Sequence, residues 1–125
     1  MILFDNEKKI FTSTLLKSGV VHGFGTKMLG DGRDVETIKQ FFNKNNISIK
    51  KIVIPEQIHS DKITVFKSHN PEPIERISNA DSVITREKGV VLTVITADCL
   101  PILYSDEKVG IIGISHQGWK GTDKK

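Results

Sequence analysis

The chain has 125 residues, a formal net charge of +3 and 38% hydrophobic residues, which suits one small domain with an ordinary core. Its basic residues occur singly or in short pairs rather than as a basic stripe with interleaved aromatic residues, so we expect no nucleic-acid partner. A start without a basic segment, apolar runs far shorter than the roughly 20 residues of a bilayer span and a single cysteine predict a cytoplasmic protein with no membrane partner.

A helix is predicted over residues 34–46. Apolar residues recur there at helical spacing, with Asp34 placed to cap the start and Asn45 followed by Asn46 to end it. Residues 28–34 and 68–73 have the composition of loops.

Strands are predicted for most of the remaining sequence. Residues 51–54 are β-branched, and residues 63–65 and 81–85 alternate between apolar and polar side chains. Residues 90–97 and 109–115 are nearly continuous runs rich in Val and Ile, which is typical of strands buried on both faces. We therefore expect the centre of a layered sheet at these two runs.

Several strands with one helix favour the α+β class, with mixed β-sheet layers and covering helices. Residues 116–122 have the pattern of a strand-to-helix turn, and the sequence ends at Lys125 before a helix is expected to form. We therefore expect an incomplete version of the fold, with its most apolar strands exposed to water.

Three side chains that suit a zinc ion follow predicted strands: His59, Cys99 and His116. Two imidazoles and a thiolate match the preferences of Zn²⁺, and three protein ligands leave a fourth position for water or substrate. The residues alone also allow an ordinary buried cysteine with hydrogen-bonded histidines, or a Cys99 nucleophile that His116 or His59 activates.

Two glycine-containing segments offer weaker candidates for binding an anion. Lys27 follows His22 in one segment, which also fits a glycine turn with a solvated lysine. Lys120 lies between Gly118 and Gly121 in the other, beside Trp119, which could equally serve only in packing.

Five motifs in the same order resemble one known family, the multicopper polyphenol oxidase or laccase-domain family, also labelled purine nucleoside phosphorylase and peptidoglycan-editing factor. They are VHGFGTK from Val21, QIH from Gln57, NAD from Asn79, TADCLP from Thr96 and HQGWKG from His116. The resemblance identifies residues 1–125 as the N-terminal part of a single domain of this family.

The resemblance implies an α+β fold in which His59, Cys99 and His116 bind zinc and act in catalysis. It further implies purine nucleoside and phosphate as partners, with phosphorolysis of adenosine, inosine, guanosine and methylthioadenosine, and adenosine deamination as an additional activity. Lys27, His22 and Lys120 match positions in its substrate-binding motifs. Lys27 and Lys120 stand where the motifs have Arg, which keeps the charge but loses the fork geometry of a guanidinium group.

Other functions remain open at the level of sequence. A copper ion on the same three ligands would fit a laccase-like polyphenol oxidase, and Cys99 could serve a cysteine hydrolase or a peptidoglycan-editing factor. A homo-oligomer or a complementing C-terminal fragment could complete the fold, and an inactive gene fragment is the remaining alternative.

Overall fold

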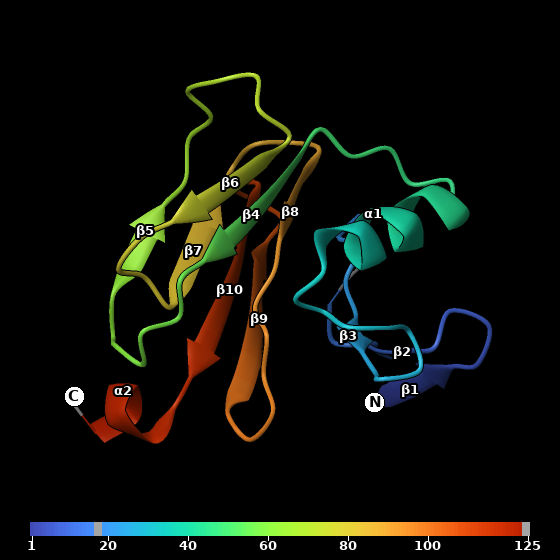
Figure 1. Ribbon diagram of the computed structural model, residues 1–125, viewed down its shortest axis with the longest axis horizontal. Helices are drawn as coiled ribbons and strands as arrows, with labels where there is room; N and C mark the ends of the chain where they lie inside the picture. Colours follow the sequence, from blue (N-terminus) through green and yellow to red (C-terminus); the bar gives the residue numbers. More distant parts are fainter. Residues whose placement is uncertain (17–18, 124–125) are drawn as a thin grey trace. The chain divides into compact units, whose positions relative to one another are not determined.

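The computed structural model describes residues 1–16 and 19–123, and the chain divides into two compact units, Met1–Ser48 and Ile49–Lys125 (Figure 1). Several sheets and few helices make up the two units, as expected for the α+β class. Among the described residues, no helix is both long enough and apolar enough to cross a membrane.

The N-terminal unit contains a three-stranded antiparallel sheet and one helix. Its strands, in spatial order, are β1 (Ile2–Asp5), β2 (Ile10–Ser13) and β3 (Phe24–Gly25). Phe4 and Phe11 are directly opposite each other in β1 and β2, with ring centroids 4.8 Å apart. Such cross-strand aromatic pairs stabilise a short hairpin.

Helix α1 (Val35–Lys44) follows this sheet and confirms the predicted helix. The Asp34 carboxylate accepts a hydrogen bond from the backbone N–H of Glu36 at 3.0 Å, as an N-cap does. At the other end the Asn45 side chain donates to the Phe41 carbonyl at 2.7 Å, and Asn46 adopts a left-handed φ of 55°. Both predicted helix ends therefore have the expected chemistry.

The C-terminal unit contains two sheets. The four-stranded sheet has the order β5-β7-β10-β9, and the three-stranded parallel sheet has the order β6-β4-β8. In the larger sheet β10 runs antiparallel to both neighbours while β5 runs parallel to β7, so the sheet is mixed. The strands are β4 (Lys51–Pro55), β5 (Ile63–Val65), β6 (Ile74–Ile77), β7 (Ser82–Thr85), β8 (Val90–Leu92), β9 (Leu100–Asp106) and β10 (Ile111–Gln117).

The most deeply buried strand is β4, with all five residues buried. Its first residue, Lys51, forms an ion pair with Glu75 at 2.9 Å, which offsets the cost of burying the ammonium group. Side chains from β4, from the segment after β5 and from β7 form the core cluster, which consists of Val53, Phe66 and Val83.

The prediction that residues 90–97 form one central buried strand is wrong. The strand ends at Leu92, and β8 is a partly exposed edge strand, because it pairs only with β4. The N–H of Thr93 still donates to the Val53 carbonyl at 3.1 Å, and beyond it the backbone runs without regular structure towards Cys99. The second predicted central run is confirmed with shifted bounds, since β10 is an inner strand of its sheet.

The expectation that no helix forms after His116 is also wrong. Helix α2 (Trp119–Asp123) makes a single turn, in which the N–H groups of Gly121 and Thr122 donate to the Gly118 carbonyl at 3.1 and 3.2 Å. A Cβ on Gly121 would lie 2.7 Å from the Ser60 carbonyl oxygen, so the glycine allows this turn to contact the loop after β4 closely.

Candidate metal centre

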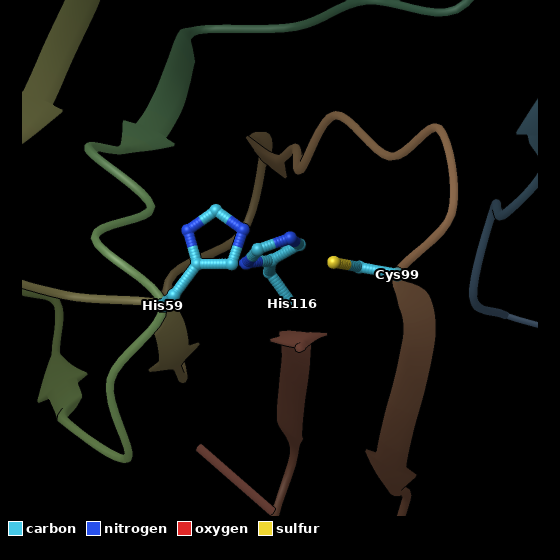
Figure 2. Close-up of side chains that lie close together, drawn as sticks. All are labelled: His59, Cys99 and His116. Atoms are coloured by element: carbon cyan, nitrogen blue, oxygen red, sulfur yellow. The ribbon is translucent and has the colours of Figure 1, made fainter. Parts of the chain in front are cut away.

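His59, Cys99 and His116 lie together in the C-terminal unit (Figure 2). One nitrogen from each imidazole and the Cys99 sulfur all lie within 4.8 Å of one another. His116 is buried, Cys99 is half-buried and His59 is exposed. The cluster is therefore anchored in the protein on one side and open to solvent on the other.

The pairing of β9 with β10 places Cys99 beside His116. Pro101 is the register partner of His116, and Leu100 is that of Gln117. Cys99 immediately precedes Leu100 in the sequence. His59 reaches the cluster from the loop after β4, where its φ of 59° is left-handed. Three segments that are distant in sequence thus supply one side chain each.

Asp81, the residue before β7, contacts both histidines of the cluster. One carboxylate oxygen, Oδ1, accepts the backbone N–H of His59 at 2.9 Å and lies 2.9 Å from Nδ1 of His116. The other, Oδ2, accepts hydrogen bonds from the backbone N–H and the hydroxyl of Ser60, both at 2.7 Å. The His116 backbone N–H also donates to the Asp81 carbonyl at 2.8 Å.

These hydrogen bonds determine the charge state of Asp81, which is fully buried. Burial by itself would raise the pKa of its carboxyl group, but hydrogen bonds from His116, Ser60 and His59 outweigh burial and lower the pKa below its usual value. The side chain is therefore a carboxylate at neutral pH. The sequence motif that contains Asp81 was recognised, but no role for the residue follows from the motif alone.

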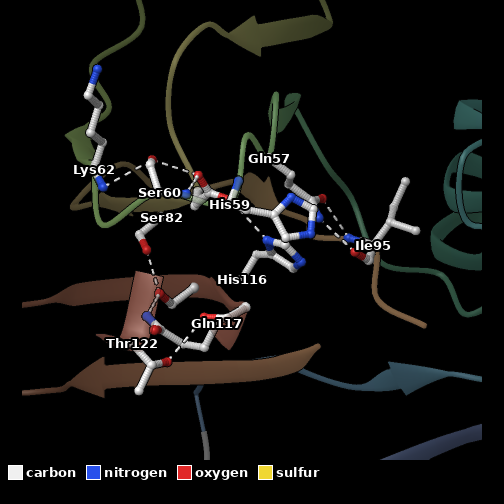
Figure 3. Close-up of polar contacts among 12 residues, drawn as sticks. Gln57, His59, Ser60, Lys62, Ser82, Ile95, His116, Gln117 and Thr122 are labelled. Carbon is white, nitrogen blue, oxygen red and sulfur yellow. Dashed lines mark hydrogen bonds and ion pairs between the residues drawn. The ribbon is translucent and has the colours of Figure 1, made fainter. Parts of the chain in front are cut away.

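Gln57 connects the loop of His59 to the segment that precedes Cys99 (Figure 3). Its side-chain amide donates to the Ile95 carbonyl at 2.6 Å, while its side-chain oxygen accepts the Ile95 N–H at 2.8 Å. The irregular segment after β8 is thus held by both backbone groups of one residue. Sequence reasoning assigned Gln57 to a motif without a role.

Gly118 forms one wall of the cluster. A Cβ at this position would lie 2.9 Å from Cδ2 of His59 and 3.4 Å from the Cys99 sulfur. A side chain there would have to displace His59 or Cys99, which explains why glycine follows β10.

The chemistry of these donors suits a transition metal. Two imidazoles and one thiolate are ligands that zinc and copper accept, with bonds of about 2.0 to 2.3 Å for zinc. The three donor atoms lie within 4.8 Å of one another, so small movements of the side chains would bring them onto one such ion. In residues 1–16 and 19–123 this is the one cluster of at least three histidine, cysteine or acidic side chains that could hold a metal.

The other predicted site residues are Lys120, Lys27 and His22. Lys120 is exposed in α2, with its ammonium 5.7 Å from the ring centroid of Trp119. Trp119 is 73% exposed, so it is not a core residue. Lys27 is exposed in the N-terminal unit, and His22 lies in the same unit. Both His22 ring nitrogens lie 3.0 Å from backbone groups, Nδ1 from the Val20 carbonyl and Nε2 from Ser13. His22 thus connects the segment before β3 to the end of β2.

Comparison with known proteins places this cluster in a family context. The sequence profile described as "Multi-copper polyphenol oxidoreductase laccase" matches residues 24–125. A protein named adenosine deaminase, from an unknown prokaryotic organism, is 36% identical over 81 residues, which are 61% of this chain and 31% of that protein. A protein named purine nucleoside phosphorylase, from Corynebacterium glutamicum, is 32% identical over 124 residues, which are 92% of this chain and 48% of that protein.

A solved structure is similar as well. The crystal structure of YlmD from Geobacillus stearothermophilus superposes with a TM-score of 0.61 at 26% identity, over 75% of this chain and 37% of that one. The chain thus spans about a third to a half of the length of the relatives it matches.

Proposed function

Because the chain belongs to the family described as multi-copper polyphenol oxidoreductase laccase, we propose that residues 1–125 are the N-terminal part of a zinc-dependent purine nucleoside phosphorylase domain. The observation that carries the proposal is the gathering of His59, Cys99 and His116, with donor atoms within 4.8 Å of one another. The name of the Corynebacterium relative supports the reaction class. The proposed substrates are inorganic phosphate with adenosine, inosine, guanosine or methylthioadenosine.

His59, Cys99 and His116 would hold the ion, and substrate could reach the cluster from the side of the exposed His59. When bound, zinc supplies Lewis-acid chemistry. The protein itself would orient the nucleoside so that a phosphate oxygen attacks the anomeric carbon of the ribose. The glycosidic bond then breaks, its electron pair leaves with the purine, and the products are ribose 1-phosphate and the free base.

Phosphate requires a cationic partner in this reaction. Lys120 supports that role, because it is exposed and follows Gly118, which contacts the ligand side chains. Lys27 and His22 belong to the proposal on the strength of their motif. An ammonium group binds phosphate as a point charge rather than through the paired hydrogen bonds of Arg.

Adenosine deamination is the second candidate, favoured by the name of one relative. It differs from phosphorolysis in a measurable way, because water replaces the amino group of adenine and ammonia leaves while the glycosidic bond stays intact. Polyphenol oxidation is less well supported. The described residues offer ligands for one metal ion, whereas a multi-copper centre needs several sets.

Metal analysis combined with an inosine assay tests the proposal. The 125-residue protein should contain about one zinc per chain and release hypoxanthine only when phosphate is present. Removal of zinc by a chelator should abolish the release, and Cys99→Ala should neither retain zinc nor act on inosine. Phosphate-dependent activity in zinc-free protein would exclude zinc dependence, and ammonia release from adenosine without phosphate would favour deamination instead.

A further inference from the structure

A single oxygen atom of Asp81 contacts two of the three proposed ligands. Oδ1 is 2.9 Å from Nδ1 of the His116 ring and 2.9 Å from the backbone nitrogen of His59. The two imidazole rings meet edge to face, with centroids 4.9 Å apart and planes at 86°. The position of one ring relative to the other therefore depends on the hydrogen bonds that hold each histidine in place.

The direction of the hydrogen bond to His116 follows from the charge of Asp81. Oδ1 accepts the backbone N–H of His59, and Oδ2 accepts the backbone N–H and the hydroxyl of Ser60, so both oxygens act as acceptors, as in a carboxylate. A carboxylate only accepts hydrogen bonds, so Nδ1 of His116 must donate. In a neutral imidazole the proton on Nδ1 leaves a lone pair on Nε2, which is the atom free to bind a metal.

We infer that Asp81 is the positioning residue of the metal centre, holding His116 in the tautomer that presents Nε2 and fixing the backbone that carries His59. The role in metal binding rests on the proposed function, whereas the tautomer does not. Histidine ligands commonly donate their second N–H to a carboxylate, and loss of that partner typically lowers metal affinity by about 10-fold to 100-fold.

The backbone contacts extend the role of Asp81 to His59. A left-handed φ costs free energy for a residue other than glycine, and the value at His59 is 59°. Asp81 accepts the N–H of His59 through one oxygen and the N–H of Ser60 through the other. These two consecutive contacts hold the loop in the conformation that directs His59 towards the cluster.

Asp81 could instead serve only to satisfy buried hydrogen-bond donors. The effect of Asp81→Asn on zinc affinity distinguishes this structural role from positioning of the metal centre. An amide has one donor group, so in either orientation it places an N–H against existing donors: His59 and His116 on one side, or Ser60 on the other. Ser60→Ala is the matched control. It removes the hydroxyl that donates to Oδ2 and accepts the Lys62 N–H, and it does not alter the groups that form the contact between Oδ1 and His116.

The test begins with unmodified, metal-free protein in which histidine is labelled with ¹⁵N. At a pH above the histidine titration range, the spectrum should show His116 protonated on Nδ1. A His116 protonated on Nε2 would overturn the inference, whether or not the protein binds zinc.

Zinc affinity is then measured by competition with a chromogenic chelator. Asp81→Asn should bind zinc about 10-fold to 100-fold more weakly, while Ser60→Ala should stay within about threefold of the unmodified protein. Equal losses in the two variants would show a structural role only and would overturn the inference. If the Asn variant does not fold, the tautomer of His116 in the unmodified protein still tests the inference. Failure of the unmodified protein to bind zinc would contradict the proposed function and leave the tautomer result standing.

Discussion

The side chain of Gln57 forms two hydrogen bonds with the backbone of Ile95, one to its carbonyl at 2.6 Å and one from its N–H at 2.8 Å. Ile95 lies in the irregular segment between β8 and β9, which ends at Cys99. At the start of this segment Thr93 donates to the Val53 carbonyl, whereas Gln57 holds Ile95, which lies closer to Cys99. We therefore expect the position of the Cys99 side chain to depend on Gln57.

Gln57→Ala should loosen this segment and weaken zinc binding about 10-fold, with a loss of roughly 1 to 3 kcal/mol in the free energy of unfolding. Chelator competition and denaturant titration measure the two effects. Asn45→Ala is the control, since it removes an amide hydrogen bond to the Phe41 carbonyl at the end of α1. Unchanged zinc affinity in the Gln57 variant would show that Cys99 is positioned independently of Gln57.

Gly118→Ala should disrupt the metal centre directly, because a Cβ at this position would lie 2.9 Å from the His59 ring. We expect zinc affinity to fall by at least about 10-fold, on the scale of losing a ligand's supporting contact. Gly32→Ala is the matched control, because a Cβ at Gly32 would meet nothing within 4 Å. Similar affinities for the two alanine variants would contradict the close approach of Gly118 to the ligands.

The stability of the C-terminal unit should depend on β4 far more than on β5. Ile52 in β4 is 1% exposed, so Ile52→Ala should cost about 2 to 5 kcal/mol of unfolding free energy. Ile63 in β5 is 65% exposed, and its alanine variant should stay within about 0.5 kcal/mol of the unmodified protein. Chemical denaturation compares them, and equal losses would mean that β4 is not the core strand.

Asp81 should also make the stability of the folded protein depend on pH in the acid range. Its pKa is lower in the folded protein than in the unfolded chain, where it is about 3.9, so its contribution is present above about pH 4. The contribution is lost as the pH falls through the folded pKa. Metal-free unmodified protein should therefore exceed Asp81→Asn in denaturation midpoint at neutral pH, and the difference should shrink below about pH 4. A difference that stays constant down to pH 3 would contradict the lowered pKa.

Sequence patterns predicted those parts of the fold whose causes are local. The helix at residues 34–46 has its apolar spacing, its Asp34 cap and its Asn45 end within one short segment, and α1 follows them closely. The apolar run at residues 90–97 was wrongly predicted as a central strand, because hydrophobicity does not reveal which strand has partners on both sides. That position belongs to β4, while β8 has a single neighbour.

Of the candidate site, the sequence predicted the three central side chains but not the residues that support them. The ligand types and their motifs singled out His59, Cys99 and His116, whose donor atoms lie together in the fold. The supporting residues were not found, because Asp81 and Gln57 act through hydrogen bonds to residues distant in sequence. Gly118 was only part of a candidate anion-binding segment, whereas the structure shows that its lack of a side chain is what the cluster requires.

The most direct test of the proposed metal centre is the zinc content of purified protein, compared between the unmodified chain and Cys99→Ala. The arrangement of His59, Cys99 and His116 predicts about one tightly bound zinc per unmodified chain and loss of that zinc in the variant. A variant that retains a full equivalent of zinc, or an unmodified chain that binds none, would contradict it.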